Sequence, residues 1–506
     1  MPQTPLRGWG LAAALALAWG IGPALPALLR GELIGQPYTD LYPAVWGLWE
    51  LARQQPGLPT HTEMLGHPSG IGYYYAAPLK GILAGGLLPL LGLPATWNLL
   101  TLAARVATPL CAFGAGRAWG LGTTGALTVA AAWGCAPLFH GYAVEGIVEG
   151  TDGWTLALWA WAAGHRRHGL SAIGLALSIL SSWYLGAAGC LLALLSALRD
   201  RRALLGLVGG LALAAPGIFL FLGAFPSAAP LPDAIRQMMG APLRVPSPGL
   251  SAGLNPFAIT AYLGWALGAA AVLAAARGEH RLVALALIPA ILSLGTGPWY
   301  DLPVLEMLRF PYRWHLATLA LLGLAVGRLA DGRGWWWLPL VVVAEGLLLS
   351  PVEPILPGAP ADVPAIYARV DGPLLEVPGP VVRPPGVVNG SRPRARYLLY
   401  AQTRHGQPSP WAPDFNGLGA AESTPHLDPF RAYDRLEVAE DWEAQAGLTA
   451  ADLAALRSRG IGLVMIQTRE LGSKRARALR AALRSLGAAE IADDGDRLLL
   501  RLPAGD

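Results

Sequence analysis

The sequence predicts an α-helical polytopic membrane protein with about eleven transmembrane helices, followed by a small α/β domain outside the membrane. The chain of 506 residues is 54% apolar and 14% charged, and its mean hydropathy of +0.42 exceeds that of ordinary soluble proteins. Apolar stretches recur up to residue 351, and most approach the roughly 20 residues that a bilayer span requires. Beyond residue 352 the sequence becomes proline-rich, and then strand-like and helix-like runs alternate.

The connectors between the apolar stretches alternate in charge. The basic connectors carry Arg7, Arg117, Arg166, Arg167, Arg199, Arg201, Arg202, Arg277, Arg281, Arg328 and Arg333. The acidic connectors carry Asp40, Glu63, Glu145, Glu149, Asp152, Asp301 and Glu306. Because basic loops stay in the cytoplasm, we expect a multi-pass protein of the inner (plasma) membrane with a cytoplasmic N-terminus and its acidic groups outside. Membrane anchoring explains the arginines, so a nucleic-acid partner has no support.

The predicted spans lie near 9–29, 96–117, 121–139, 147–164, 169–182, 184–198, 203–224, 256–276, 281–296, 313–330 and 335–351. The first is as long as a span, and no clean small-x-small cleavage site follows it, so we expect an uncleaved helix. Residues 76–93 are broken by prolines and glycines and are expected to form a half-embedded helix on the outer side. A turn at 181–184 is expected to divide 169–198 into two short helices, which keeps the following arginines in the cytoplasm.

The chain is predicted to consist of a transmembrane domain (1–351) and an extracytoplasmic α/β domain (352–506). Two regions are expected outside the membrane: one loop of the transmembrane domain and the whole α/β domain. The first is the loop 30–95, in which Asp40–Arg53 is expected to form an amphipathic helix in the membrane interface. The second contains strand-like runs at 374–377, 396–400, 462–468 and 497–502, with helices near 449–459 and 473–486.

Three carboxylates stand out as candidate functional groups. Asp40, at the start of the expected interfacial helix, is either a general base or metal ligand, or an N-cap of that helix. Glu149 and Asp152 begin a span that must reach Arg166, which places them at or below the outer interface. Carboxylates at that depth usually face a water-filled cavity, although a solvated loop is the alternative.

Basic side chains near the same face are candidates for binding a phosphate. Arg309 and Arg313 flank a proline-fixed turn and could hold a phosphate through bidentate hydrogen bonds, but arginine is also ordinary at an interface. Arg105 lies inside a span, where it needs either a phosphate or a carboxylate partner. Lys80 and His67 complete the candidate set, with His67 in a loop whose nitrogen and carboxylate groups could instead bind zinc or manganese.

Several segments resemble the GT-C-type integral membrane glycosyltransferases, which use polyprenyl-phosphate sugars. The resemblance rests on Asp40 in a long loop after the first helix, the segments 78–92, 116–120 and 174–184, the Arg105-bearing span, the stretch Leu302–Trp314 (LPVLEMLRFPYRW), and the segments 397–400, 402–408 and 462–468. These motifs are short and degenerate, but together they span most of the chain.

The resemblance implies an inverting sugar transfer in which Asp40 activates the acceptor. Relatives similar to oligosaccharyltransferases place a metal-binding acidic pair in the second outer loop, where Glu149 and Asp152 fall. This chain departs from the family pattern because its first loop lacks a clear Asp-x-Asp. The sequence therefore assigns no cofactor, and the resemblance suggests a divalent metal (Mg²⁺ or Mn²⁺) as the candidate.

The sequence thus favours a membrane glycosyltransferase of the hexosyltransferase type. Its expected partners are a polyprenyl-phosphate sugar donor, the lipid bilayer, and a glycan or lipid acceptor. One alternative is a non-catalytic protein that handles or flips lipid-linked sugars, which needs the arginines but not Asp40. A second alternative is a secondary transporter, which predicts discontinuous helices in matched halves; no such internal symmetry is seen.

Overall fold

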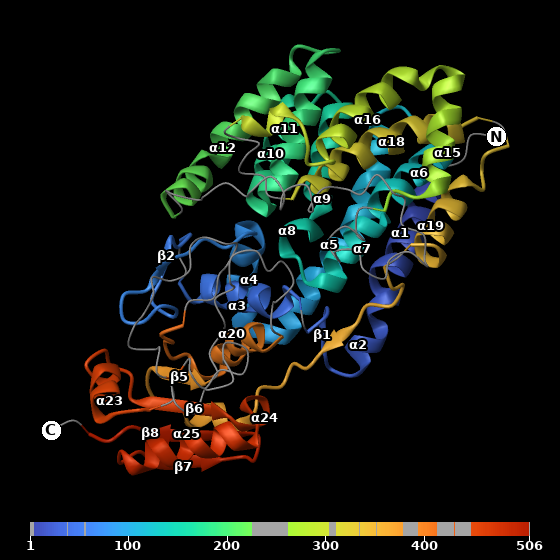
Figure 1. Cartoon of the computed structure of the whole chain (residues 1–506). Coiled ribbons are helices and arrows are strands. Elements are labelled where there is room, and N and C mark those ends of the chain that lie inside the picture. The colour runs from blue at the N-terminus through green and yellow to red at the C-terminus, as the bar shows by residue number, and fades with distance from the viewer. Residues whose placement is uncertain are drawn as a thin grey trace.

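The computed structural model describes residues 5–37, 39–54, 57–224, 262–302, 310–332, 334–350, 352–377, 393–411, 430 and 447–504. Long helices occupy one end of the molecule and a mixed β-sheet occupies the other (Figure 1). Between them lie α3 (Leu41–Arg53), α4 (Pro78–Leu91) and α20 (Pro393–His405), which belong to the first loop and the C-terminal part of the chain.

The helical end is built from short and long helices that follow the predicted apolar stretches. They are α1 (Pro5–Ile21), α2 (Leu25–Leu29), α5 (Leu93–Ala118), α6 (Thr123–Val129), α7 (Pro137–Glu145), α8 (Val148–Thr151), α9 (Gly153–Gly164), α10 (His168–Ser181), α11 (Trp183–Ala197), α12 (Ala203–Ala224), α15 (Trp265–Ala274), α16 (His280–Leu292), α18 (His315–Ala330) and α19 (Leu338–Leu348).

Four described stretches are long and apolar enough to cross a membrane, namely Arg7–Leu29, Leu93–Ala118, Thr123–Glu145 and Ala203–Ala224. The other predicted spans correspond to shorter helices, and part of 256–276 lies outside the described residues. A membrane protein is therefore supported, whereas eleven crossings and the orientation remain predictions. The expected break between α10 and α11 is present, because Ser182 is extended and its hydroxyl accepts a hydrogen bond from the Tyr184 N–H.

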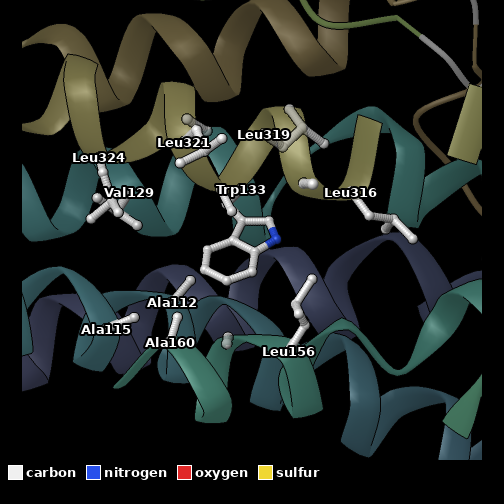
Figure 2. Close-up of a cluster of buried hydrophobic side chains, with 14 of the residues drawn as sticks. Ala112, Ala115, Val129, Trp133, Leu156, Ala160, Leu316, Leu319, Leu321 and Leu324 are labelled. Atoms are coloured by element: carbon white, nitrogen blue, oxygen red, sulfur yellow. The ribbon is translucent and has the colours of Figure 1, made fainter. Parts of the chain in front are cut away.

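The helical core closes around Trp133, which lies in a π-helical turn, Ala130–Gly134, between α6 and α7. Its ring points into a space lined by small and branched residues of α5, α9 and α18, including Ala112, Leu156 and Leu316 (Figure 2). A Cβ atom at Gly134 would stand 2.3 Å from the Cα of Pro109. Glycine is required there because the two backbones meet without room for a side chain.

Helix α3 is buried nearly all round, which corrects the prediction of an amphipathic helix lying in the membrane interface. Residues on every side of it are buried, among them Leu41, Trp46 and Leu48. The expected apolar stripe exists, but α4, α20 and the chain that follows α3 cover the remaining surface. For example, the Tyr75 hydroxyl donates to the Ala44 carbonyl at 2.9 Å.

The C-terminal sheet contains β5 (Leu374–Val377), β6 (Leu463–Gln467), β7 (Ala489–Asp493) and β8 (Arg497–Arg501) in the order β5-β6-β8-β7. The first pair is parallel and the others are antiparallel. Helices α23 (Ala450–Arg457) and α25 (Ser473–Ser485) occur where the sequence predicts them. Strand β7 was not predicted. The boundary at 351/352 stays a prediction, since nothing tests it directly.

Residues 396–400, expected to form a strand, belong instead to helix α20. The four consecutive residues from Leu398 to Ala401 are all buried. Leu399 and Tyr400 pack against α3, while Ala401 packs against the sheet. A helix that is covered on two sides carries an uninterrupted apolar run, which resembles the run of a buried strand.

Helix α20 fastens the C-terminal part to α3. The Trp46 indole N–H donates to the Gln402 side-chain oxygen at 2.7 Å, and the ring of Tyr42 stacks on that of Tyr400 with centroids 5.0 Å apart. A second link is the pairing of β1 (Leu33–Ile34) with β4 (Gly358–Ala359). The helix that follows Asp40 is therefore held from both sides.

The histidine at the end of α20 gives the C-terminal part a testable dependence on pH. Burial lowers the pKa of His405 to about 4, and its neutral Nδ1 accepts a hydrogen bond from the Gln407 N–H. The unfolded chain takes up this proton near pH 6.5, whereas the folded chain takes it up only near pH 4. The stabilisation is therefore complete above pH 6.5 and is lost as the pH falls towards 4, at up to about 1.4 kcal/mol per pH unit.

We expect His405→Gln to flatten the fall in melting temperature between pH 6.5 and 4.5, measured by intrinsic fluorescence of the full chain. An unchanged pH profile in the variant would show that other groups control this acid sensitivity.

Candidate active site

The loop before α3 is fixed against the end of α7, and this contact positions Asp40. The backbone N–H of Asp40 and the hydroxyl of Thr39 both donate to the Glu145 carbonyl, at 3.0 Å and 2.7 Å. The next residue, Gly146, has φ +67°, and a Cβ atom on it would stand 2.4 Å from the Cα of Leu41. Asp40 occupies the N-cap position of α3, but its side chain makes no capping hydrogen bond, which weakens the interpretation as a cap.

Glu149 in α8 pairs with Arg313 in the turn that precedes α18. The guanidinium Nη1 lies 3.5 Å from the Glu149 Oε1, and the exposed fractions of the two side chains are 2% for Arg313 and 20% for Glu149. Gly150 allows α8 to approach this closely, because a Cβ atom there would stand 2.0 Å from the ring of Tyr142.

Arg313 is enclosed by aromatic rings. Its guanidinium carbon lies 4.2 Å from the ring centroid of Tyr184 and 4.4 Å from that of Phe310, with Tyr142 and Tyr312 at 5.7 Å and 5.8 Å. Ring faces attract a cation, which helps to offset the loss of water around the guanidinium. A tyrosine hydroxyl also supplies a polar contact, since the Arg313 Nε donates a hydrogen bond to the Tyr312 hydroxyl at 3.3 Å.

Lys80 in α4 pairs with Asp152, three residues beyond Glu149. Its ammonium nitrogen lies 3.5 Å from the Asp152 Oδ1, hydrogen-bonds to the Thr151 hydroxyl, and lies 5.9 Å from the centre of the Trp97 ring. Both charged side chains are buried. The segment 149–152 therefore faces two buried cations that come from distant parts of the chain.

Electrostatic effects on two tyrosines show that these groups share one region. Burial raises the pKa of Tyr75 well above its ordinary value, and the carboxylates of Asp152 and Glu149 raise it further. Burial likewise raises the pKa of Tyr312, to which the carboxylates of Glu149 and Asp40 contribute. Glu149 and Asp152 therefore lie near Tyr75, and Glu149 and Asp40 lie near Tyr312.

Arg105 serves a different part of the molecule. Its Nη2 donates to the Trp19 carbonyl at 2.7 Å, and its Nε donates to the Gly20 carbonyl at 3.2 Å. Pro23 lacks the N–H that would have bonded to Trp19 in a continuous helix, so the arginine satisfies a carbonyl freed at the break between α1 and α2. The remaining contact of Nη2 is with His140, at 3.2 Å. Arg105 is therefore engaged with backbone oxygens and a histidine.

Two other predicted ligands are not brought into this region by any described contact. The backbone N–H of His67 donates to the Ser409 carbonyl, and its ring lies 3.2 Å from the Cβ position of Gly460 in the C-terminal part. Arg309 lies outside the described residues, as do 303–308.

The described residues do not fit a metal site. Among them, no group of three His, Cys, Asp or Glu side chains is placed to hold an ion. Glu149 and Asp152, the predicted metal ligands, face Arg313 and Lys80 instead. We therefore derive no step through a metal ion.

The aromatic part of the site was not predicted from the sequence. Tyr142 and Tyr184 lie in apolar helices and carry no motif. The one available signal for Tyr184 was its position at the end of the expected break at 181–184. Thr151 was passed over between two acidic residues, although it contacts Lys80.

Comparison with solved structures identifies the fold. The chain is similar to the mycobacterial arabinofuranosyltransferase AftD, with a TM-score of 0.53 and 17% identity. The chain has the fold of a GT-C-type membrane glycosyltransferase. The match covers 99% of this chain but only 42% of AftD, so the protein spans about two fifths of that enzyme's length.

Weaker GT-C likenesses extend to two further enzymes. The oligosaccharyltransferase AglB of Archaeoglobus fulgidus, in complex with an inhibitory peptide and a dolichol-phosphate, gives a TM-score of 0.47 and 11% identity over 91% of this chain and 69% of AglB. ArnT of Cupriavidus metallidurans, in the apo state, gives 0.45 and 15% over 98% of both chains. No family model matches the sequence, and no curated protein matches it significantly.

The contact of Gly146 with Leu41 can be tested by Gly146→Ala. The new Cβ atom would push the Asp40 loop away from α7 and would require an unfavourable positive φ, which costs about 1–3 kcal/mol. We expect a lower melting temperature in detergent micelles. Gly169→Ala is the matched control, because Gly169 is helical and nothing lies within 4 Å of its Cβ position. Equal melting temperatures for both variants would contradict the close contact.

The pairing of Lys80 with Asp152 predicts strong coupling between the two positions. Lys80→Met leaves a buried carboxylate without its cation, which typically costs about 3–5 kcal/mol. We expect Lys80→Met/Asp152→Asn to unfold at a higher temperature than Lys80→Met alone, measured by thermal unfolding in micelles. Additive effects of the two changes would show that the groups do not interact.

Proposed function

We propose that the protein is a membrane glycosyltransferase that moves a sugar from a polyprenyl-phosphate donor to a hydroxyl of a glycan or lipid acceptor. The observation that carries the proposal is the placement of two buried cations, Lys80 and Arg313, against the segment 149–152 on a glycosyltransferase fold, with Asp40 close enough to act on Tyr312 next to Arg313. Buried cations of this kind suit an anionic ligand whose charge increases during the reaction.

In the proposed reaction, Asp40 accepts the proton of the acceptor hydroxyl while that oxygen forms a bond to the anomeric carbon. The bond between that carbon and the phosphate oxygen breaks, and the lipid phosphate leaves with the electron pair. Attack opposite to the leaving group inverts the anomeric configuration. General-base assistance of this kind contributes typically about 10²–10⁴-fold.

The leaving phosphate gains one negative charge. It therefore needs nearby positive charge more than it needs to be protonated. The Arg313 guanidinium offers a planar set of N–H donors, whereas the Lys80 ammonium acts as a point charge. Both are buried, so an anion that reaches them interacts in an environment of low dielectric constant. Arg309 remains a proposed third contact that lies outside the described residues.

A lipid-linked donor fits the surroundings of Lys80. The lysine is buried, yet Ile82, Leu83 and Leu90 on the same helix are 43%, 47% and 78% exposed. A phosphate at Lys80 would therefore leave its isoprenoid chain beside exposed apolar side chains of α4. The sorting of arginines in the sequence supports a reaction on the extracytoplasmic face.

The alternative is a protein that binds or moves lipid-linked sugars without transferring them. That role uses the same cations and apolar surface, and it differs in not requiring a base. Loss of the Asp40 carboxylate therefore separates the two functions.

The test is Asp40→Asn in purified protein supplied with radiolabelled polyprenyl-phosphate sugars and a membrane extract as the acceptor source. We expect the rate of transfer to fall by at least about 100-fold, because the amide does not act as a base. Donor binding should change little. Glu63→Gln is the matched control, since Glu63 is an exposed carboxylate of the same loop. Undiminished transfer by Asp40→Asn would remove Asp40 from the reaction.

A further inference from the structure

The ion pair between Arg313 and Glu149 is incomplete. Within the described part of the chain, the Arg313 Nη1 makes no hydrogen bond, although this side chain is 2% exposed. Its distance of 3.5 Å from the Glu149 Oε1 exceeds the usual length of about 2.7–3.2 Å for an N–H···O hydrogen bond. A buried guanidinium N–H without an acceptor is unfavourable, so the site favours an additional anion at this position.

A second unsatisfied group lies beside the first. The hydroxyl of Tyr142 is fully buried and has no hydrogen-bond partner among the described residues. Its ring lies 5.7 Å from the Arg313 guanidinium carbon. A phosphate oxygen bound to Arg313 would give both groups an acceptor, which a single carboxylate at 3.5 Å does not.

Glu149 differs from its partner in its access to solvent. Its side chain is 20% exposed, and it belongs to a four-residue helix between two glycines, Gly146 and Gly153. Glu149 can therefore leave Arg313 and be hydrated by water at a lower cost in free energy. Arg313 is held in place because four rings enclose it.

From these contacts, and resting on the proposed function, we propose that Glu149 competes with the lipid phosphate for Arg313. In the free protein Glu149 occupies the guanidinium. The donor phosphate displaces it, and after sugar transfer the returning carboxylate assists release of the lipid phosphate. Glu149 thus lowers the affinity of the protein for the product lipid phosphate, and it touches no reacting atom.

The proposal reverses the effect expected of a structural ion pair. If Glu149 only orients Arg313, Glu149→Gln weakens binding of a lipid phosphate. If Glu149 competes with it, the same change strengthens binding, because the ligand no longer displaces a carboxylate. Although the contact between Glu149 and Arg313 is not a hydrogen bond, loss of its ionic attraction to a buried guanidinium is enough to change the affinity about tenfold.

The experiment measures the affinity of full-length protein in lipid nanodiscs for undecaprenyl phosphate, by quenching of tryptophan fluorescence. We expect Glu149→Gln to lower the dissociation constant about tenfold. In the transfer assay we expect both KM and kcat to fall, because release of the product becomes slower. Glu149→Asp, with a shorter reach to Arg313, should give an intermediate affinity and serves if the first variant folds poorly. Glu63→Gln is the control.

Weaker or unchanged binding of undecaprenyl phosphate by Glu149→Gln would overturn the proposal. A gain of equal size for inorganic phosphate would overturn the assignment to a lipid ligand. If neither the wild type nor any variant binds undecaprenyl phosphate, the proposed function itself fails. If the wild type binds it and Glu149→Gln binds no more tightly, only the competition by Glu149 fails.

Discussion

The site depends on the placement of two buried cations against one short acidic segment. Lys80 comes from the first loop and Arg313 from the turn before α18, and both meet residues 149–152. A buried charge is tolerated only when another charge or hydrogen bond satisfies it. The segment 149–152 therefore joins parts of the chain that are more than two hundred residues apart.

The residues just before this segment contact the loop that carries the proposed base. Glu145 and Gly146 fix the backbone of Asp40 from one side, and α20 holds α3 from the other. Packing and backbone hydrogen bonds therefore fix the main chain at Asp40, and a rigid backbone is the usual support for a functional group.

The sequence predicted the helical architecture and the region of the site because hydrophobic length and charge sorting are local properties. Asp40, Glu149, Asp152 and Lys80 were all singled out, and the structure brings them together. Pairings between them were not predictable, since Lys80 and Asp152 are far apart in sequence. Burial was also misjudged where it depends on distant segments, as in α3, which packs against α20 at Tyr42 and Trp46.

Other errors have equally specific causes. The contacts of Arg105 with the Trp19 and Gly20 carbonyls were not predicted, because a backbone acceptor freed at Pro23 carries no charge. Its Nη1 has no hydrogen-bond partner among the described residues, so the phosphate contact stays a prediction. Strand β7 was missed because its sequence, AEIAD, is too polar to stand out. The aromatic enclosure of Arg313 combines residues from α7, α11 and the turn before α18, which no local pattern reveals.

The central claim is that Lys80 and Arg313 jointly hold a lipid-linked phosphate beside Asp40. A structure of the protein with bound undecaprenyl phosphate tests it most directly. We expect phosphate oxygens within hydrogen-bonding distance of both the Lys80 ammonium and the Arg313 guanidinium. A phosphate bound elsewhere, with Lys80 still paired to Asp152 and Arg313 still paired to Glu149, would contradict it.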